Sequence, residues 1–123
     1  MKLVDSCGWL QFFTDGPLGS SYGKELSSKP EEILVPSIVL YEVFKFLLRT
    51  SGEETAIRCT AHMTQCQVVD LDATLALESA ETSTQSNLAM ADAIVYTISR
   101  KFDAPLITSD SDLKGLEGVT FVK

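Results

Sequence analysis

The sequence contains only three cysteines, Cys7, Cys59 and Cys66, and a single histidine, His62. An odd number of cysteines without a CxxC pair argues against a disulfide framework, and one histidine leaves too few soft ligands for a zinc site. Repeats and low-complexity segments are absent, and no apolar run approaches the roughly 20 residues that span a bilayer. We therefore expect free thiols, a reducing compartment and a cytoplasmic protein without a membrane segment.

Positive charge is also scarce. Ten Lys and Arg residues stand against 17 Asp and Glu residues, which gives a net charge of −7. Such a charge balance repels a phosphate backbone at long range. A nucleic acid is therefore excluded as a partner unless something else, such as a bound cation, supplies positive charge.

The chain has the size and composition of one globular domain. Its 123 residues can bury a real core but are too few for two ordinary domains, and its hydrophobic share of 45% is typical of soluble proteins. The first residues, "MKLVDSCGWLQFF", include an Asp within the apolar run and no small-residue cleavage site. We therefore expect a first strand and helix instead of a signal peptide, and a single domain over residues 1–123.

Short apolar runs and longer amphipathic segments alternate along the chain. The short runs predict strands over residues 2–4, 32–36, 67–72, 105–108 and 119–122. The longer segments predict helices over residues 6–13, 37–50, 53–63 and 73–83, one that begins near Ala89, and a short helix or turn over 111–116. Strands separated by helices indicate βαβ units. The fold class is therefore α/β, with a mostly parallel sheet between helices.

Several residues mark the expected ends and faces of these helices. Ser6 can cap the first helix, Asp72 can cap the helix over 73–83, and Gly52 can end the helix over 37–50. In the helix that begins near Ala89, the spacing of apolar residues predicts a buried stripe of Ala91, Ile94, Val95, Ile98 and Phe102.

Carboxylates accompany several of the predicted strands. Asp5 follows the first strand directly, and Asp110 and Asp112 follow the strand over 105–108. Ligands of open parallel sheets bind at the carboxyl ends of the strands, so these three side chains should project from one edge. Glu42 and Asp92 lie in the early turns of helices that are otherwise apolar around them. All five carboxylates could therefore converge.

Carboxylates without partners repel one another by about 1 kcal/mol per pair in water and by several times that near a protein surface. Either their pKa values rise and some bind protons, or a divalent cation such as Mg²⁺ or Mn²⁺ lies among them. Each acid also has an ordinary explanation, because Asp5, Asp92 and Asp110 can stabilise helix starts. Glu42 fits that explanation least well, since it lies several residues into its helix.

Four segments together carry a family resemblance: "VDS", "YEV", "MADAIVYTIS" and "LITSDSDLKGLEGV". In this order, and over essentially the whole chain, they resemble PIN-domain ribonucleases, especially small single-domain toxins of the VapC type. The resemblance implies a three-layer α/β/α fold with a mostly parallel central sheet. It also implies an acidic pocket that binds Mg²⁺ or Mn²⁺, which activates water to cleave an RNA phosphodiester bond.

The same resemblance implies roles for individual residues. The catalytic acids would be Asp5, Glu42, Asp92 and Asp110. The metal ligands would be Asp5, Asp92, Asp110 and Asp112. Ser6 and Thr108 match small hydroxyl positions beside the first and last acids, where they would orient a carboxylate or a water molecule.

Contacts with RNA have weaker sequence signals. Lys45 and Arg49 share a helix face with Glu42, so they could bind phosphates that flank the cleaved bond, although a simple solvated face explains them equally well. The Gly- and Ser-rich segment over residues 14–30 is a loop and helix region in which we expect mobility and substrate contact.

The resemblance further implies two protein partners, a cognate antitoxin and a second copy in a homodimer. Trp9, Phe12, Phe13 and the apolar helix over 37–50 could form such an interface, although core packing explains most of these residues. Two other functions stay open. A non-catalytic PIN-like dimerisation or antitoxin-binding module would gain nothing from clustered acids, and a metal-dependent phosphatase or receiver-type phosphoacceptor would need an early Asp-x-Asp motif that the sequence lacks.

Overall fold

The computed structural model describes all residues from Met1 to Lys123. The strands are β1 (Lys2–Val4), β2 (Ile33–Pro36), β3 (Gln67–Val69), β4 (Leu106–Thr108) and β5 (Val119–Phe121). The α-helices are α1 (Ser6–Phe13), α2 (Gly19–Leu26), α3 (Ser37–Thr50), α4 (Glu53–Met63), α5 (Ala73–Ser86) and α6 (Met90–Lys101). Two short 3₁₀ helices complete the chain, η1 (Pro30–Glu32) and η2 (Ser111–Leu113). None of the helices combines the length and the hydrophobicity that a bilayer crossing requires.

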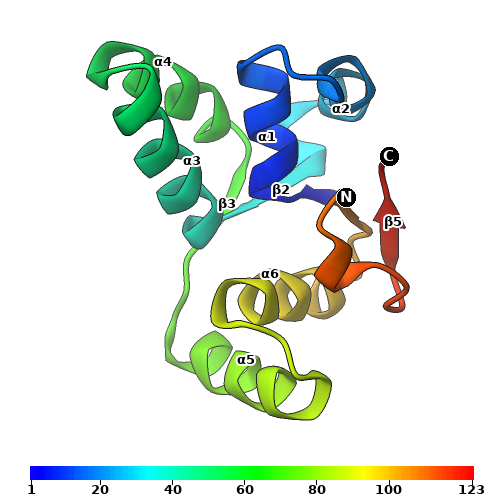
Figure 1. Ribbon diagram of the computed structural model, residues 1–123. Helices are drawn as coiled ribbons and strands as arrows, with labels where there is room; N and C mark the ends of the chain where they lie inside the picture. The colour runs from blue at the N-terminus through cyan, green and yellow to red at the C-terminus, as the bar shows by residue number, and fades with distance from the viewer.

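All five strands pair in parallel, in the order β3-β2-β1-β4-β5. Helices α1 to α4 lie on one side of the strands, and α5 and α6 lie on the other side (Figure 1). The predicted three-layer α/β/α fold is therefore confirmed, and the sheet is parallel throughout.

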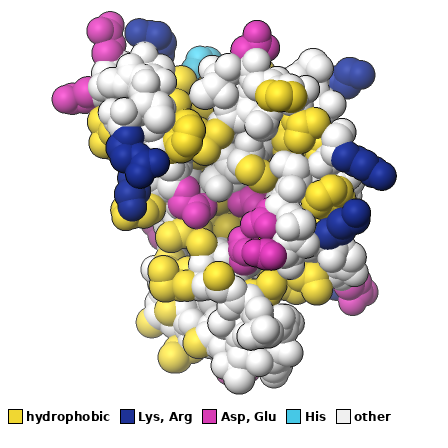
Figure 2. Space-filling model, viewed as in Figure 1, with side chains coloured by type: hydrophobic (Ala, Val, Ile, Leu, Met, Phe, Trp, Pro, Cys, Tyr) yellow, Lys and Arg dark blue, Asp and Glu magenta, His cyan; other side chains and the backbone are white.

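The strand order places a topological switch point beside β1. The chain moves from β1 to β2 and β3 on one side, and β4 and β5 continue the sheet on the other side. In open parallel sheets a crevice forms at the carboxyl ends of the two strands that flank such a point, here β1 and β4. The space-filling view shows acidic side chains gathered near the centre of the molecule's visible face (Figure 2).

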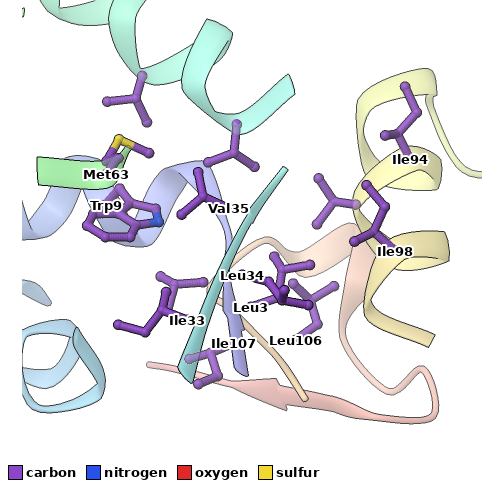
Figure 3. Close-up of a cluster of buried hydrophobic side chains, with 14 of the residues drawn as sticks. Leu3, Trp9, Ile33, Leu34, Val35, Met63, Ile94, Ile98, Leu106 and Ile107 are labelled. Atoms are coloured by element: carbon purple, nitrogen blue, oxygen red, sulfur yellow. The ribbon is translucent and has the colours of Figure 1, made fainter. Parts of the chain in front are cut away.

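Helices cover both faces of the sheet, so nearly every residue of β1, β2 and β4 is buried. Leu3, Leu34 and Leu106 are register partners and share the face that packs toward α6, where Ile94 and Ile98 lie (Figure 3). Ile33, Val35 and Ile107 point to the opposite face, toward Trp9 of α1 and Met63 of α4 (Figure 3). This alternation fixes the register on which the site depends.

Some predicted helix ends and faces are wrong. Asp5, not Ser6, caps α1, because the Asp5 side chain accepts a hydrogen bond from the Ser6 backbone N–H. The predicted stop at Gly52 is confirmed, because Ser51 is the C-cap of α3 and the next residue, Gly52, has a φ of 91° and donates its backbone N–H to Leu47 O. Phe102 is 44% exposed because it lies beyond the last turn of α6, where the chain leaves the helix.

The segment over residues 14–30, expected to be mobile, contains α2 and the start of η1. Its Tyr22 is completely buried, and the backbone N–H of Leu18 donates a hydrogen bond to Gln11 Oε1 of α1 at 2.9 Å. Packing of Tyr22 against α1 therefore holds a helix whose Gly and Ser content alone favours a loop. Substrate contact by this segment stays a prediction.

Gly8 makes room for Tyr22. A Cβ atom at Gly8 would overlap with the Tyr22 ring and with the Val4 side chain. We therefore expect Gly8→Ala to lower the free energy of unfolding by about 2 kcal/mol, as overpacked cores do. Urea denaturation followed by the fluorescence of Trp9, the only tryptophan, measures this change.

Gly23 provides the matched control, because a Cβ there would make an ordinary contact of 3.6 Å with Phe12. Gly23→Ala should stabilise the protein by up to about 1 kcal/mol, since alanine favours a helix interior over glycine. Equal effects of the two substitutions would contradict the close approach of Tyr22 to α1.

Candidate active site

Asp5 lies where β1 ends and α1 begins, and its side chain is 5% exposed. Its Oδ1 atom accepts a hydrogen bond from the Ser6 backbone N–H at 2.8 Å. Its Oδ2 atom accepts a hydrogen bond from the Thr108 hydroxyl at 2.9 Å. Because both oxygens are held, the orientation of this carboxylate is fixed by β4 as well as by its own helix.

Asp110 lies two residues beyond β4 and caps η2, because its Oδ1 atom accepts a hydrogen bond from the Asp112 backbone N–H at 2.9 Å. The Asp110 backbone N–H donates to Thr108 Oγ1 at 3.0 Å. The buried Thr108 hydroxyl therefore joins Asp110 to Asp5.

Asp92 completes an acidic triad, by which we mean Asp5, Asp92 and Asp110. It lies in the first turn of α6 and is half-buried. One carboxylate oxygen from each of the three residues lies within 4.8 Å of the others. The triad thus brings together the end of β1, the start of α6 and the loop after β4.

The electrostatics of the triad favour protons or a cation. Burial, the charges of Asp110 and Asp5, and a hydrogen bond with Asp110 raise the pKa of Asp92 to about 7. Burial also raises the pKa of Asp5, although the hydrogen bonds from Ser6 and Thr108 oppose this rise. Without a cation, the pocket therefore retains a proton near neutral pH.

Glu42 of α3 is close to the triad but outside it. Its carboxylate is half-buried, and burial, followed by the charge of Asp5, raises its pKa. A hydrogen bond with the Ser6 side chain, in the first turn of α1, lowers the pKa of Glu42 and so opposes this rise. The structure therefore brings Glu42 and Ser6 to the side of the pocket formed by α1 and α3.

Asp112 is exposed in η2 and does not belong to the triad, although its charge contributes to the raised pKa of Asp92. Lys45 and Arg49 are exposed on α3 and form no ion pair. The Lys45 Nζ atom lies 5.7 Å from the ring centroid of Tyr41. Lys and Arg side chains appear on both sides of the acidic group in Figure 2.

The chemistry of the triad fits a hard divalent cation. Carboxylate oxygens are the ligands that Mg²⁺ and Mn²⁺ prefer, and three of them converge without any Lys or Arg within salt-bridge distance. A cation would also offset the mutual repulsion that raises the pKa of Asp92.

Sequence reasoning missed the polar residues behind the triad. Tyr22, Ser109 and Cys7 contact one another, and Cys7 also contacts Thr108, whose hydroxyl donates to Asp5. The one available signal was Gly8, because a glycine inside a helix indicates the close approach of another group.

An all-parallel α/β domain with an acidic pocket at its switch point is the class that the fold and the site define. The family model of the PIN domain matches residues 2–119, and the chain belongs to the PIN-domain family. No curated protein matches the sequence closely enough to serve as a relative.

Solved structures share the fold at low sequence identity. A toxin–antitoxin complex from Klebsiella pneumoniae has 20% identity and a TM-score of 0.82, with 98% of this chain and 96% of that chain covered. VapC20 of Mycobacterium tuberculosis, described as a Sarcin-Ricin loop cleaving toxin, has 19% identity, a TM-score of 0.76 and coverage of 93% and 92%. VapBC2 from Rickettsia felis, bound to a DNA fragment from its promoter, has 17% identity, a TM-score of 0.75 and coverage of 98% and 96%.

Proposed function

We propose that the protein is a metal-dependent endoribonuclease of the VapC type that hydrolyses RNA phosphodiester bonds. The observation that carries this proposal is the convergence of Asp5, Asp92 and Asp110 within 4.8 Å at the switch point of a PIN-family domain. The three carboxylates come from parts of the chain that only the folded domain brings together. Helix capping alone would explain the position of Asp5 and that of Asp110. It does not explain why Asp92 lies so close to both that their charges help to raise its pKa.

In this proposal Asp5, Asp92 and Asp110 hold Mg²⁺ or Mn²⁺, and Asp112 joins them from the exposed rim. The bound cation supplies a water ligand of lowered pKa and offsets charge on the phosphate oxygens. Glu42 presents a carboxylate beside Asp5 that can accept a hydrogen bond from water in the pocket.

Ser6 and Thr108 have supporting roles in the same pocket. Thr108 holds the carboxylate of Asp5, and the side chain of Ser6 lies against Glu42. Lys45 and Arg49 bind the phosphates that flank the cleaved bond, because they are exposed on the helix that carries Glu42 and have no acidic partner.

The proposal includes a cytoplasmic protein with an antitoxin and a second copy of the chain as partners. Support comes from the similar structures, one of which is a toxin–antitoxin complex. The chain also exposes large apolar side chains that a partner could cover, among them Phe12, Tyr41, Leu77 and Met90.

The first test is direct metal binding. We expect chelator-stripped protein to bind Mn²⁺ saturably in a calorimetric titration, and Asp92→Asn to abolish that binding because it removes one ligand. Asp103→Asn is the matched control, since it makes the same chemical change just past the other end of α6, about 16 Å from Asp92 by the helical rise per residue. Asparagine also tolerates the φ of 51° at that position.

The two outcomes separate the candidate functions. Saturable binding that only the Asp92 substitution removes supports the nuclease pocket. If folded wild-type protein binds no Mn²⁺, the proposal is wrong, and a non-catalytic dimerisation or antitoxin-binding module replaces it.

A further inference from the structure

A continuous series of polar contacts lies behind the acidic triad and ends on Asp5. The Tyr22 hydroxyl donates to Ser109 Oγ at 2.9 Å, and Ser109 Oγ donates to Cys7 Sγ at 3.5 Å. Cys7 Sγ lies 3.6 Å from Thr108 Oγ1, and the Thr108 hydroxyl donates to Asp5 Oδ2 at 2.9 Å. Helices α1 and α2 and the end of β4 all contribute to this series.

The direction of each hydrogen bond follows from the number of hydrogens. A hydroxyl group has one hydrogen to donate and two lone pairs to accept. Thr108 uses its hydrogen on Asp5, so the contact between Cys7 and Thr108 requires the thiol to donate. The second lone pair of Thr108 accepts from the Asp110 backbone N–H at 3.0 Å. The bonds therefore all point the same way, from Tyr22 to the carboxylate of Asp5.

Burial makes this arrangement strong. Tyr22 and Thr108 are both 0% exposed. Burial is the main cause that raises the pKa of Tyr22, so its hydroxyl keeps the hydrogen that it donates to Ser109. Ser109 uses its own hydrogen on Cys7, so it accepts from Tyr22. Hydrogen bonds in series polarise one another in a low-dielectric environment, so each strengthens the next.

We propose that Tyr22 is a positioning residue for the acidic triad, because its hydroxyl orders Ser109 and Cys7 and, through them, Thr108. Thr108 holds two triad members, Asp5 by its hydroxyl and Asp110 by its oxygen. The effect on metal binding rests on the proposed function, whereas the ordering itself is a property of the metal-free protein. Helix α2 thus acts on the pocket without touching it.

Tyr22→Phe tests this role because it removes one oxygen atom and keeps the ring that packs over Gly8. We expect the Kd for Mn²⁺ to rise about tenfold, the usual effect of losing an outer partner of a metal ligand. We also expect the Asp110 amide, which donates to Thr108, to exchange its hydrogen faster in metal-free protein, as measured by NMR on ¹⁵N-labelled samples.

Tyr96→Phe is the matched control. The Tyr96 hydroxyl donates to the backbone oxygen of Glu117 at 2.8 Å, so the same substitution removes a comparable hydrogen bond outside the series. This variant should leave both the Mn²⁺ affinity and the Asp110 exchange rate unchanged.

Cys7 separates positioning from general packing. Cys7→Ala interrupts the series and should match Tyr22→Phe in both measurements. Cys7→Ser keeps a group that both accepts and donates, so it should retain most of the wild-type Mn²⁺ affinity. Equal losses in the two Cys7 variants would show that only side-chain volume matters, and would overturn the proposal.

The experiment also separates this inference from the proposed function. If wild type binds Mn²⁺ and Tyr22→Phe matches it in affinity and in Asp110 exchange, Tyr22 has no positioning role. If wild type binds no Mn²⁺, the proposed function is wrong, and the exchange rate of Asp110 still decides whether Tyr22 orders the pocket.

Discussion

Asp5→Asn and Asp92→Asn should each reduce RNA cleavage by about a thousandfold or more, because each removes a charged ligand at the centre of the triad. Total bacterial RNA incubated with Mn²⁺ and separated by electrophoresis measures this loss. Asp103→Asn, outside the pocket, should cleave as wild type does. A doubly substituted protein, Asp5→Asn with Asp92→Asn, that still cleaves RNA would contradict the assignment of the site.

The two substitutions should differ in their effect on the stability of the metal-free protein, because the two carboxylates have different surroundings. Asp92→Asn removes a repulsive charge, so metal-free protein should gain about 1 kcal/mol in free energy of unfolding. Asp5→Asn should bring no such gain, because the Asp5 carboxylate accepts hydrogen bonds on both oxygens, from Ser6 and from Thr108. An asparagine side chain has one acceptor oxygen and can keep only one of them.

The second large effect is that the affinity for Mn²⁺ should depend on pH, because the pKa of Asp92 is raised to about 7. A cation must displace the proton that Asp92 holds below that pH. The affinity for Mn²⁺ should therefore rise by about tenfold per pH unit up to pH 7 and change little above it. Calorimetric titrations at several pH values measure the slope, and an affinity independent of pH below 7 would contradict it.

The stability of the metal-free protein should also depend on pH, but in the opposite direction: it should fall as pH rises, whereas the affinity for Mn²⁺ rises. Between the ordinary Asp pKa of 3.8 and the raised value of about 7, the folded protein binds more protons at Asp92 than the unfolded chain does. The stabilisation that this proton contributes is therefore fully present below this range and is lost as pH rises through it. We expect a loss of about 1–2 kcal/mol between pH 5 and pH 8, limited by solvent screening of a half-buried group.

Urea denaturation in the presence of a chelator measures this loss. Asp92→Asn should show a smaller slope with pH than wild type, because the substituted side chain does not titrate. The same slope in both proteins would mean that another group causes the pH dependence.

The elements that carry the acids could be predicted from sequence because their signals are local. "KLV" before Asp5 and "LIT" before Ser109 and Asp110 are apolar runs that end in acids, and parallel pairing brings their ends together. Asp92 could be placed because it lies in the first turn of a strongly patterned helix. For these residues, local pattern and global fold agree.

The parts of the fold and the site that the sequence does not predict depend on contacts between residues far apart in the chain. Helix α2 is held by the burial of Tyr22 over Gly8, which no property of its own Gly- and Ser-rich sequence indicates. The bond from Tyr22 to Ser109 joins residues 87 positions apart, so spacing gives no sign of it. Asp112 follows the same strand as Asp110, but η2 turns the chain between them and leaves Asp112 exposed.

The pairing of β1 with β4 also determines when the pocket can exist during synthesis of the protein. Leu3 and Val4 pair with Leu106 and Ile107, so the two strands that flank the pocket lie far apart in the sequence, and the bond from Thr108 to Asp5 joins residues 103 positions apart. A ribosome makes Asp5 and Asp92 before it makes Asp110. A nascent chain therefore carries no complete acidic triad until β4 and Asp110 have been made, and the ribosome that makes this proposed ribonuclease is not exposed to a finished site before that point.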